Sequence, residues 1–250
     1  SPILFVMMAI AVVYALRRRS PLEWLLAVVS VVVFALFVYS ALHKRVEANW
    51  PAPTYVSAIV LLCVHRWGQR GRRWLTGGVV LAGLLSAVIY ADAVAPVLPV
   101  PARKDPVARA FGWEAMTDAA LHAARAPHAP SARSWLGAER YQNASELAFH
   151  ADDRGVFALN LTGRANQFDL WPSFPERASA GDRLVLALNA DDEQKKGTPE
   201  VVSLLEPYFR DVRRGALVIR RRGEGAIGRV RIYSLDGWLG EWPERQEESR

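Results

Sequence analysis

Long apolar runs dominate the first ~95 residues of this chain, and they limit its fold more than any other feature. A helix needs about 20 predominantly apolar residues to cross the hydrocarbon core of a bilayer. Pro51 and Pro53 weaken one of the runs, because they predict irregular backbone at its start. We expect an α-helical membrane bundle of about four spans. The predicted segments are residues 2–16, 24–42, 48–64 and 75–91.

Clusters of arginine between these segments predict the orientation of the bundle. One cluster lies at residues 17–19 and the other at residues 66–73. Cytoplasmic loops of membrane proteins carry an excess of Lys and Arg, so both clusters are expected in the cytoplasm. The last segment then ends on the outer side. Together with an Arg- and Ala-rich composition, this predicts a multi-pass protein of the bacterial inner membrane whose soluble part is periplasmic.

The chain begins at Ser1 inside an apolar run, with no basic region before that run. A secretory signal peptide carries its basic region first, whereas here Arg17 to Arg19 come afterwards. We therefore expect the chain to be the C-terminal part of a longer membrane protein.

The formal net charge of +6 is better explained by arginines beside membrane helices, facing anionic headgroups, than by nucleic acid. The single cysteine, Cys63, lies in an apolar run, so it forms no disulfide within the chain. The five histidines have no metal-ligand spacing. We predict no nucleic-acid partner and no cofactor, and a divalent metal stays open as an alternative.

The outer loop at residues 40–55 is the candidate ligand site of the apolar half. Cations are unusual on the outer side, and a lipid phosphate would explain them. Lys44 would bind it as a point charge and Arg45 as a planar fork. Glu47, Trp50 and Tyr55 complete the candidate site. The alternative is an ordinary interface, in which aromatic rings and long cationic side chains sit among the headgroups.

Residues 96–106 are Pro-rich and predict an extended linker. Beyond it, residues 107–250 predict a small extracytoplasmic α/β domain, because apolar strand-like runs alternate with helical patterns. Expected helices cover residues 107–125, 143–150 and 201–209. Expected strands cover residues 135–138, 156–160 and 184–189, with a closing hairpin at 217–220 and 229–233.

The segment Gly223 to Gly228 matches the dinucleotide fingerprint G-x-G-x-x-G. That motif requires a strand before it and a helix after it. A strand-like alternation follows here, so the segment predicts a hairpin turn.

Two stretches of the soluble part alternate polar side chains with aromatic rings, which is typical of carbohydrate sites. The alternative is that the amides hold a long loop together, because buried polar groups must be hydrogen-bonded. The candidate glycan-binding residues are Tyr141, Gln142, Glu146, Arg164, Asn166, Gln167 and Trp171.

The stretch from His43 to Tyr55 resembles the C-terminal membrane half of bacterial glycosyltransferase family 39. These enzymes are protein-mannosyltransferase-like and use polyprenyl-phosphate sugars. Residues 141–149 and 158–172 are similar to the soluble tail of one bacterial branch, and the resemblance extends over about residues 40–235. Trp50 departs from the pattern, since better-studied relatives carry Tyr in a slightly different spacing.

This resemblance implies a GT-C membrane fold and inverting transfer of a sugar from a polyprenyl-phosphate carrier to a glycan, lipid or protein acceptor. It also implies a catalytic carboxylate in an early outer loop, so no catalytic residue is expected within this chain. Lys44 matches the basic residue that lies near the donor phosphate, and Arg45 shares that role. The competing hypothesis is a non-catalytic, membrane-anchored periplasmic module that binds a glycan or a partner. A transporter is disfavoured, because the apolar segments carry almost no polar residues at mid-depth.

Overall fold

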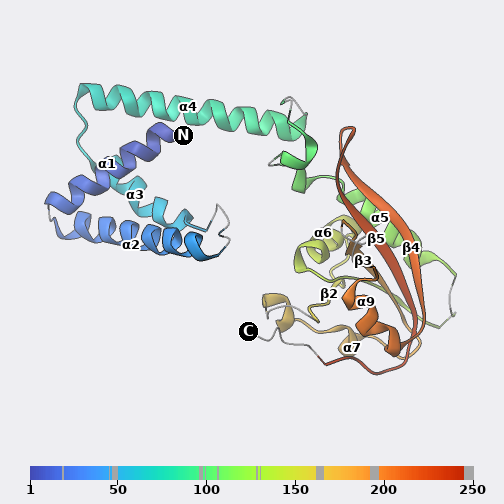
Figure 1. Ribbon diagram of the computed structural model, residues 1–250. Coiled ribbons are helices and arrows are strands. Elements are labelled where there is room, and N and C mark those ends of the chain that lie inside the picture. The colour runs from blue at the N-terminus through green and yellow to red at the C-terminus, as the bar shows by residue number, and fades with distance from the viewer. Residues whose placement is uncertain are drawn as a thin grey trace. The chain divides into compact units, whose positions relative to one another are not determined.

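The computed structural model of the protein (Figure 1) describes residues 1–18, 20–44, 46, 50–95, 98, 100–105, 107–127, 129, 131–161, 166–191 and 197–244. The chain forms two compact units, residues 1–98 and residues 99–250.

The N-terminal unit is helical. Leu, Ala, Val and Phe occupy most positions of its most apolar helix, residues 21–43, which leaves no polar face. Two of the helices, α2 and α4, are long and apolar enough to cross a bilayer, while α3 is apolar but shorter. The helices are α1 (Pro2–Arg18), α2 (Pro21–His43), α3 (Ala52–Val64) and α4 (Gln69–Val94).

Small side chains hold the first three helices together. Ala11, Ala15, Ala27 and Ala58 are buried where α1, α2 and α3 meet, and small residues let helix backbones approach closely. On α4, a Cβ added at Gly78 would lie only 2.9 Å from a Leu4 methyl group of α1. The close packing of this unit therefore depends on alanine and glycine at the helix contacts.

The C-terminal unit is a mixed α/β domain, as the sequence predicts. Its sheet has the strand order β2-β1-β3-β5-β4. Strand β1 is parallel to both β2 and β3, whereas β5 is antiparallel to β3 and β4. The strands are β1 (Ser134–Ala138), β2 (Phe157–Ala158), β3 (Arg183–Asn189), β4 (Phe209–Arg222) and β5 (Gly225–Trp238).

Helices and short helical turns connect and cover these strands. The helix expected from residue 107 begins only at Trp113, because Gly112 takes a left-handed conformation with φ of 74°. The strand expected at 156–160 is shorter, at Phe157–Ala158. The α-helices are α5 (Trp113–Arg125), α6 (Tyr141–Ala151), α7 (Phe174–Arg177) and α9 (Glu200–Leu205), and the 3-10 turns are η1 (Ala102–Lys104), η2 (Ala108–Ala110), η3 (Gln167–Leu170) and η4 (Glu206–Tyr208).

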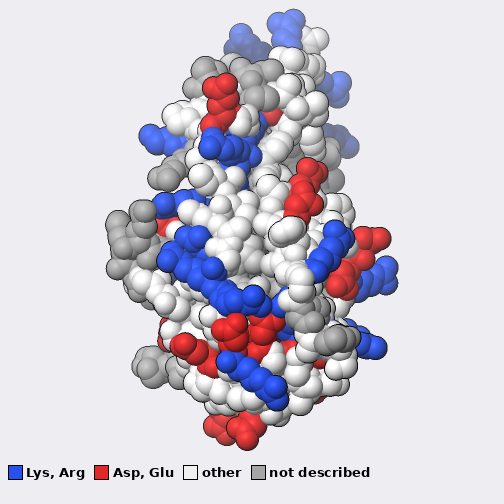
Figure 2. All heavy atoms as spheres, turned by 90° about the vertical axis from the view of Figure 1, so that its right-hand side faces the viewer, with Lys and Arg blue, Asp and Glu red and all other residues white. Residues whose placement is uncertain are grey.

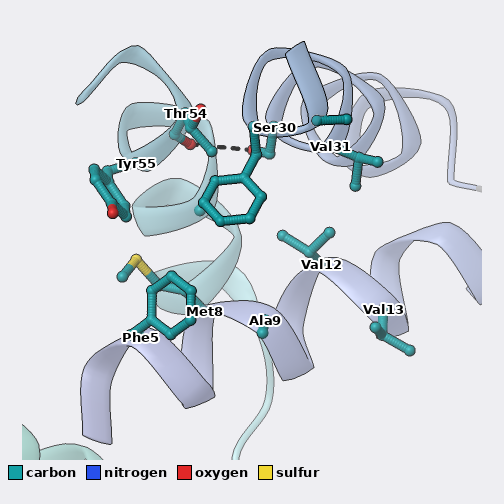
Figure 3. A pocket seen from close by; sticks show the side chains of 12 residues that line it. Phe5, Met8, Ala9, Val12, Val13, Ser30, Val31, Thr54 and Tyr55 are labelled. Atoms are coloured by element: carbon teal, nitrogen blue, oxygen red, sulfur yellow. Dashed lines mark hydrogen bonds between the residues drawn. The ribbon is translucent and has the colours of Figure 1, made fainter. Parts of the chain in front are cut away.

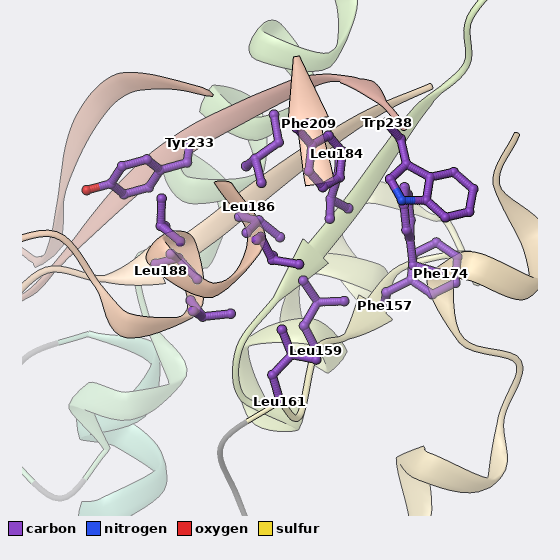
Figure 4. Close-up of a cluster of buried hydrophobic side chains, with 14 residues drawn as sticks. Phe157, Leu159, Leu161, Phe174, Leu184, Leu186, Leu188, Phe209, Tyr233 and Trp238 are labelled. Carbon is purple, nitrogen blue, oxygen red and sulfur yellow. The ribbon is translucent and has the colours of Figure 1, made fainter. Parts of the chain in front are cut away.

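Strand β3 is buried on both faces, so each face of the sheet has its own core. Successive side chains of a strand point to opposite faces. Leu184 and Leu186 join a core that includes Phe174 and Trp238 (Figure 4). Val185 instead packs in the core beneath α5 and α6. A strand buried in this way reads as a continuous apolar run, which explains why β3 was visible in the sequence.

Strands β4 and β5 form the predicted hairpin, which is longer than the sequence indicated. The two-residue turn is Gly223–Glu224, and Gly223 has φ of 55°. This confirms a hairpin turn in the glycine-rich segment, although Gly225 to Gly228 already belong to β5. On the face seen in Figure 2, Lys and Arg side chains gather in a band with Asp and Glu side chains beside it.

The segment that enters the C-terminal unit packs against the tip of this hairpin. Ala102 lies so close to Gly225 that an added Cβ would be 2.4 Å from the alanine methyl group. Arg222 forms a buried ion pair with Asp105. The Arg220 guanidinium lies 3.3 Å from the centre of the Trp113 ring. These contacts attach the start of the unit to its longest strands.

Candidate functional site

Residues 40–55 of the N-terminal unit contain the first group of candidate residues. Lys44 is exposed and ends α2, where its backbone N–H donates to the Ser40 carbonyl at 2.8 Å. Trp50 is half exposed, and Tyr55 lies in the first turn of α3. The candidates Arg45 and Glu47 lie outside the described residues.

An apolar cavity of about 310 Å³ lies between α1, α2 and α3 (Figure 3). Its lining includes Phe5 and Met8 from α1, Val31 from α2, and Tyr55 from α3. Ser30 also lines it, but its hydroxyl donates to the Thr54 carbonyl at 3.3 Å. Below, we call this cavity the apolar groove.

The Thr54 hydroxyl differs from the other groups that line the apolar groove. The Thr54 side chain is only 6% exposed, and its Oγ1 has no hydrogen-bond partner among the described residues. A buried hydroxyl without a partner costs free energy, so such groups usually bind a water or a ligand. This hydroxyl is therefore a polar contact point in an otherwise apolar wall.

The apolar groove extends from the middle of α2 to the first turn of α3. Thr54 and Tyr55 belong to the first turn of α3, directly after the loop. On α2, Ala35 lines the groove nine residues before Lys44, and a helix rises about 14 Å over that distance. The apolar wall and the exposed Lys44 at the end of α2 therefore belong to one bundle and are separated by about 14 Å along that helix.

The second group of candidates lies at one edge of the sheet in the C-terminal unit. The two sequence stretches that contain them follow β1 and β2, which are parallel. Parallel strands present their carboxyl ends at one edge, which is where ligands bind in open α/β sheets. The Tyr141 ring, at the start of α6, stacks on the Phe168 ring of η3 with centres 5.4 Å apart. Tertiary structure thus joins the two stretches.

Three polar side chains hold the η3 loop in shape. Asn166 Oδ1 accepts from the Phe168 N–H at 2.9 Å, and Asp169 Oδ2 accepts from the Asn166 N–H at 2.6 Å. The Asn160 amide donates to both Asp169 oxygens, at 3.2 and 3.1 Å. Asn166 therefore helps to hold the loop together, which is the alternative to a direct role in glycan binding.

The remaining candidate glycan-binding residues differ in their exposure and their contacts. Gln142 and Gln167 are exposed. Glu146 lies one helical turn from His150, with 3.8 Å between its carboxylate oxygen and the imidazole Nε2. Trp171 is 62% exposed, which is high for a ring of its size. Arg164 lies outside the described residues.

Two hollows flank Trp171. The smaller, about 170 Å³, is lined by the apolar core and by Asn160. The larger, about 630 Å³, is lined by Glu176 and Arg177 of α7. Both hollows are also lined by Trp171 and Asp169.

Sequence reasoning missed three of the residues around these cavities. Ser173 and Glu176 form a capping box at α7, and the S/T-x-x-E spacing of that motif is visible in the sequence. Thr54 carries no comparable signal, because its importance depends on burial. Among the described residues, no group of three or more His, Cys, Asp or Glu side chains could hold a metal ion.

No protein-family model matches the chain, and no curated protein or solved structure is significantly similar to it.

Proposed function

We propose that this chain is the C-terminal part of an integral membrane glycosyltransferase, which moves a sugar from a polyprenyl-phosphate carrier to an acceptor on the outer face of the membrane. The observation that carries the proposal is an apolar groove in the same bundle in which α2 ends at the exposed Lys44. A polyprenyl phosphate combines the same two properties, an apolar tail and an anionic head.

The surface of the helical unit supports a location in the bilayer. Leu36 and Leu42 of α2 are 60% and 78% exposed, and Val94 at the end of α4 is 89% exposed. A helix that is apolar all round is stable only in a protein core or in lipid. In the proposal, α1 and α3 complete a bundle of four spans, and residues 99–250 lie on the periplasmic side.

The groove supports a role in holding the carrier. Its walls are side chains of α1, α2 and α3 that cannot hydrogen-bond, except at Ser30, Thr54 and Tyr55. Part of a prenyl chain fits such a surface without leaving polar groups unpaired. The carrier phosphate would then lie toward the outer loop, within reach of Lys44 and the neighbouring Arg45.

The chemistry assigned to this chain is stabilisation of the leaving group. The acceptor hydroxyl oxygen attacks the anomeric carbon while the bond from that carbon to the carrier phosphate breaks. A carboxylate supplied elsewhere in the full-length protein takes the hydroxyl proton. The departing phosphate keeps the bonding electron pair, and the cations of the outer loop stabilise its charge.

The test uses membranes that contain the full-length protein and radiolabelled polyprenyl-phosphate sugar. The double variant Lys44→Ala and Arg45→Ala is expected to lower transfer by about 100-fold, because a pair of charged groups stabilises the transition state by a few kcal/mol. Arg72→Ala, which removes an exposed cation in the first turn of α4, is the matched control and is expected to leave transfer unchanged. Equal transfer by the double variant and the control would contradict the phosphate role.

A second experiment tests the groove. Val31→Trp fills it, whereas Leu36→Trp adds the same ring to α2 at an exposed position outside the groove lining. The first variant is expected to raise the KM for the carrier-linked sugar at least tenfold, while the second leaves it unchanged. Indistinguishable KM values would show that the carrier binds elsewhere.

The second candidate function is a non-catalytic, membrane-anchored periplasmic module. The exposure of Leu170 and Trp171, at 83% and 62%, favours a binding surface in the C-terminal unit. One experimental outcome distinguishes the two candidate functions. A full-length protein that binds glycan but transfers no label from any polyprenyl-phosphate sugar would be a binding module.

A further inference from the structure

Trp171 packs against a second aromatic ring although most of its surface is exposed. Its ring meets the Phe168 ring edge-on at 4.5 Å, and Phe168 stacks in turn on Tyr141. The capping box of η3, from Asn166 to Asp169, fixes the backbone just before Trp171. A ring that is already ordered loses little conformational entropy when a ligand binds to it.

Polar groups surround this ring on the side of the larger hollow. Ser173 donates its backbone N–H and its hydroxyl to Glu176 Oε2, at 2.5 and 3.0 Å. These hydrogen bonds, led by the one from the backbone, lower the pKa of Glu176 below its ordinary value. Glu176 is therefore ionised at neutral pH and can accept hydrogen bonds. Arg177, beside it in α7, is an exposed donor.

The mixture of these groups limits what the hollow can bind. The hollow is an open, shallow depression of about 630 Å³, so it can contact one face of a small ligand rather than enclose the ligand. Asp169 and Glu176 together outweigh the single positive charge of Arg177, which disfavours an anionic ligand. The hollow offers two carboxylate acceptors, one guanidinium donor and the flat indole of Trp171. This combination suits a molecule with an apolar face and a rim of hydroxyl groups.

We infer that the hollow between Trp171 and α7 binds one pyranose ring of a neutral saccharide. The C–H face of the sugar packs on the indole, whose π face carries partial negative charge. Sugar hydroxyls donate to the carboxylate of Glu176 and accept from Arg177. The binding site itself is independent of the proposed transferase activity. Assigning this saccharide as the acceptor of the transfer would rest on that proposed function.

The test uses the full chain in lipid nanodiscs, labelled with 5-fluorotryptophan. Comparison with Trp171→Phe assigns the Trp171 fluorine resonance. Methyl α-mannopyranoside, methyl β-glucopyranoside and methyl β-galactopyranoside are titrated separately, with glucuronate as the anionic counterpart. We expect at least one neutral glycoside to shift the Trp171 resonance saturably, with a millimolar dissociation constant, and glucuronate to bind several-fold more weakly.

Two variants and a control test the residues, with saccharide binding followed by saturation-transfer NMR. Trp171→Ala is expected to weaken binding at least tenfold. Arg177→Ala is expected to weaken it at least threefold without altering the Trp171 fluorine resonance of the free protein. Phe149→Ala removes another aromatic ring, 79% exposed, that lies outside the hollow lining, and is expected to leave the affinity unchanged.

The outcomes separate the inference from the proposed function. No shift of the Trp171 resonance with any neutral glycoside would overturn the inference, and so would equal losses of affinity in Trp171→Ala and Phe149→Ala. Tighter binding of glucuronate than of its neutral counterparts would overturn the assignment to neutral sugars. Saccharide binding without sugar transfer in the radiolabel assay would refute the transferase and leave this site intact.

Discussion

Replacing Asp236 by alanine is expected to lower the free energy of unfolding of residues 99–250 by about 3 kcal/mol, because it leaves a buried charge without its partner. The buried charge is Arg183, whose side chain is 1% exposed. Arg183 Nη1 donates to the carbonyls of Ala123 and Ala126, and Nη2 to that of Pro127. The carboxylate of Asp236 accepts from Nε and supplies the opposite charge.

The expected magnitude follows from the degree of burial. Breaking a fully buried ion pair by removing one partner costs about 3–5 kcal/mol. Asp236 is 18% exposed, and its other partner, Arg213, is 55% exposed, so water can solvate part of the site left behind. The lower end of the range is therefore expected. Arg183 also joins β3 to the end of α5, so local unfolding there should accompany the loss.

Urea unfolding of residues 99–250 measures the change, since this part is a compact unit with its own core. The control is Asp211→Ala, which removes an exposed carboxylate 3.2 Å from Arg213 and should cost less than about 1 kcal/mol. A loss at Asp236 no larger than that at Asp211 would refute the argument from burial.

The pH dependence gives an independent check. Burial raises the pKa of Asp236, but the hydrogen bonds from Arg213 and Arg183 outweigh burial and hold it below its ordinary value. A carboxyl group with a lowered folded pKa stabilises the protein above its unfolded pKa of about 3.9, and this stability disappears as the pH falls through the folded pKa. The difference in unfolding free energy between wild type and Asp236→Ala should therefore be constant near neutral pH and shrink below about pH 4. A difference that does not change on acidification would contradict this linkage.

Three further outcomes are expected. Gly225→Ala should destabilise residues 99–250 by about 1–3 kcal/mol and speed amide exchange in η1, because the new methyl group would clash with Ala102. Unchanged exchange in η1 would show that the contact is not tight. Phe174→Ala, at 1% exposure, should cost about 3–5 kcal/mol in urea unfolding, and a loss under about 1 kcal/mol would mean that the core refills the space. In a variant without the native cysteine, Ser203→Cys should react with a membrane-impermeant maleimide in intact spheroplasts, whereas Gly68→Cys should not react. The reverse labelling pattern would show that the orientation is opposite to the proposed one.

Features that depend on neighbouring residues could be predicted from the sequence. The apolar runs of α2 and α4 are long enough to define helices by composition alone. The glycine-rich hairpin turn was predicted from the alternation that follows it. The buried strand β3 was predicted from its continuous apolar run. In each case the signal is local, because side-chain period and backbone freedom are set within a few residues.

Features that depend on distant residues were decided by tertiary structure alone. Ser30 and Thr54 meet although they are 24 positions apart, and the groove they line has no sequence signature. Trp171 was a candidate from its residue type, but only the fold stacks its neighbouring ring, Phe168, on Tyr141, which lies 27 positions earlier in the chain. Arg183 looks like a surface charge in the sequence, and it is buried because carbonyls at the end of α5 converge on it. Burial and convergence arise from packing between segments, whereas sequence periodicity reports only what each segment can form by itself.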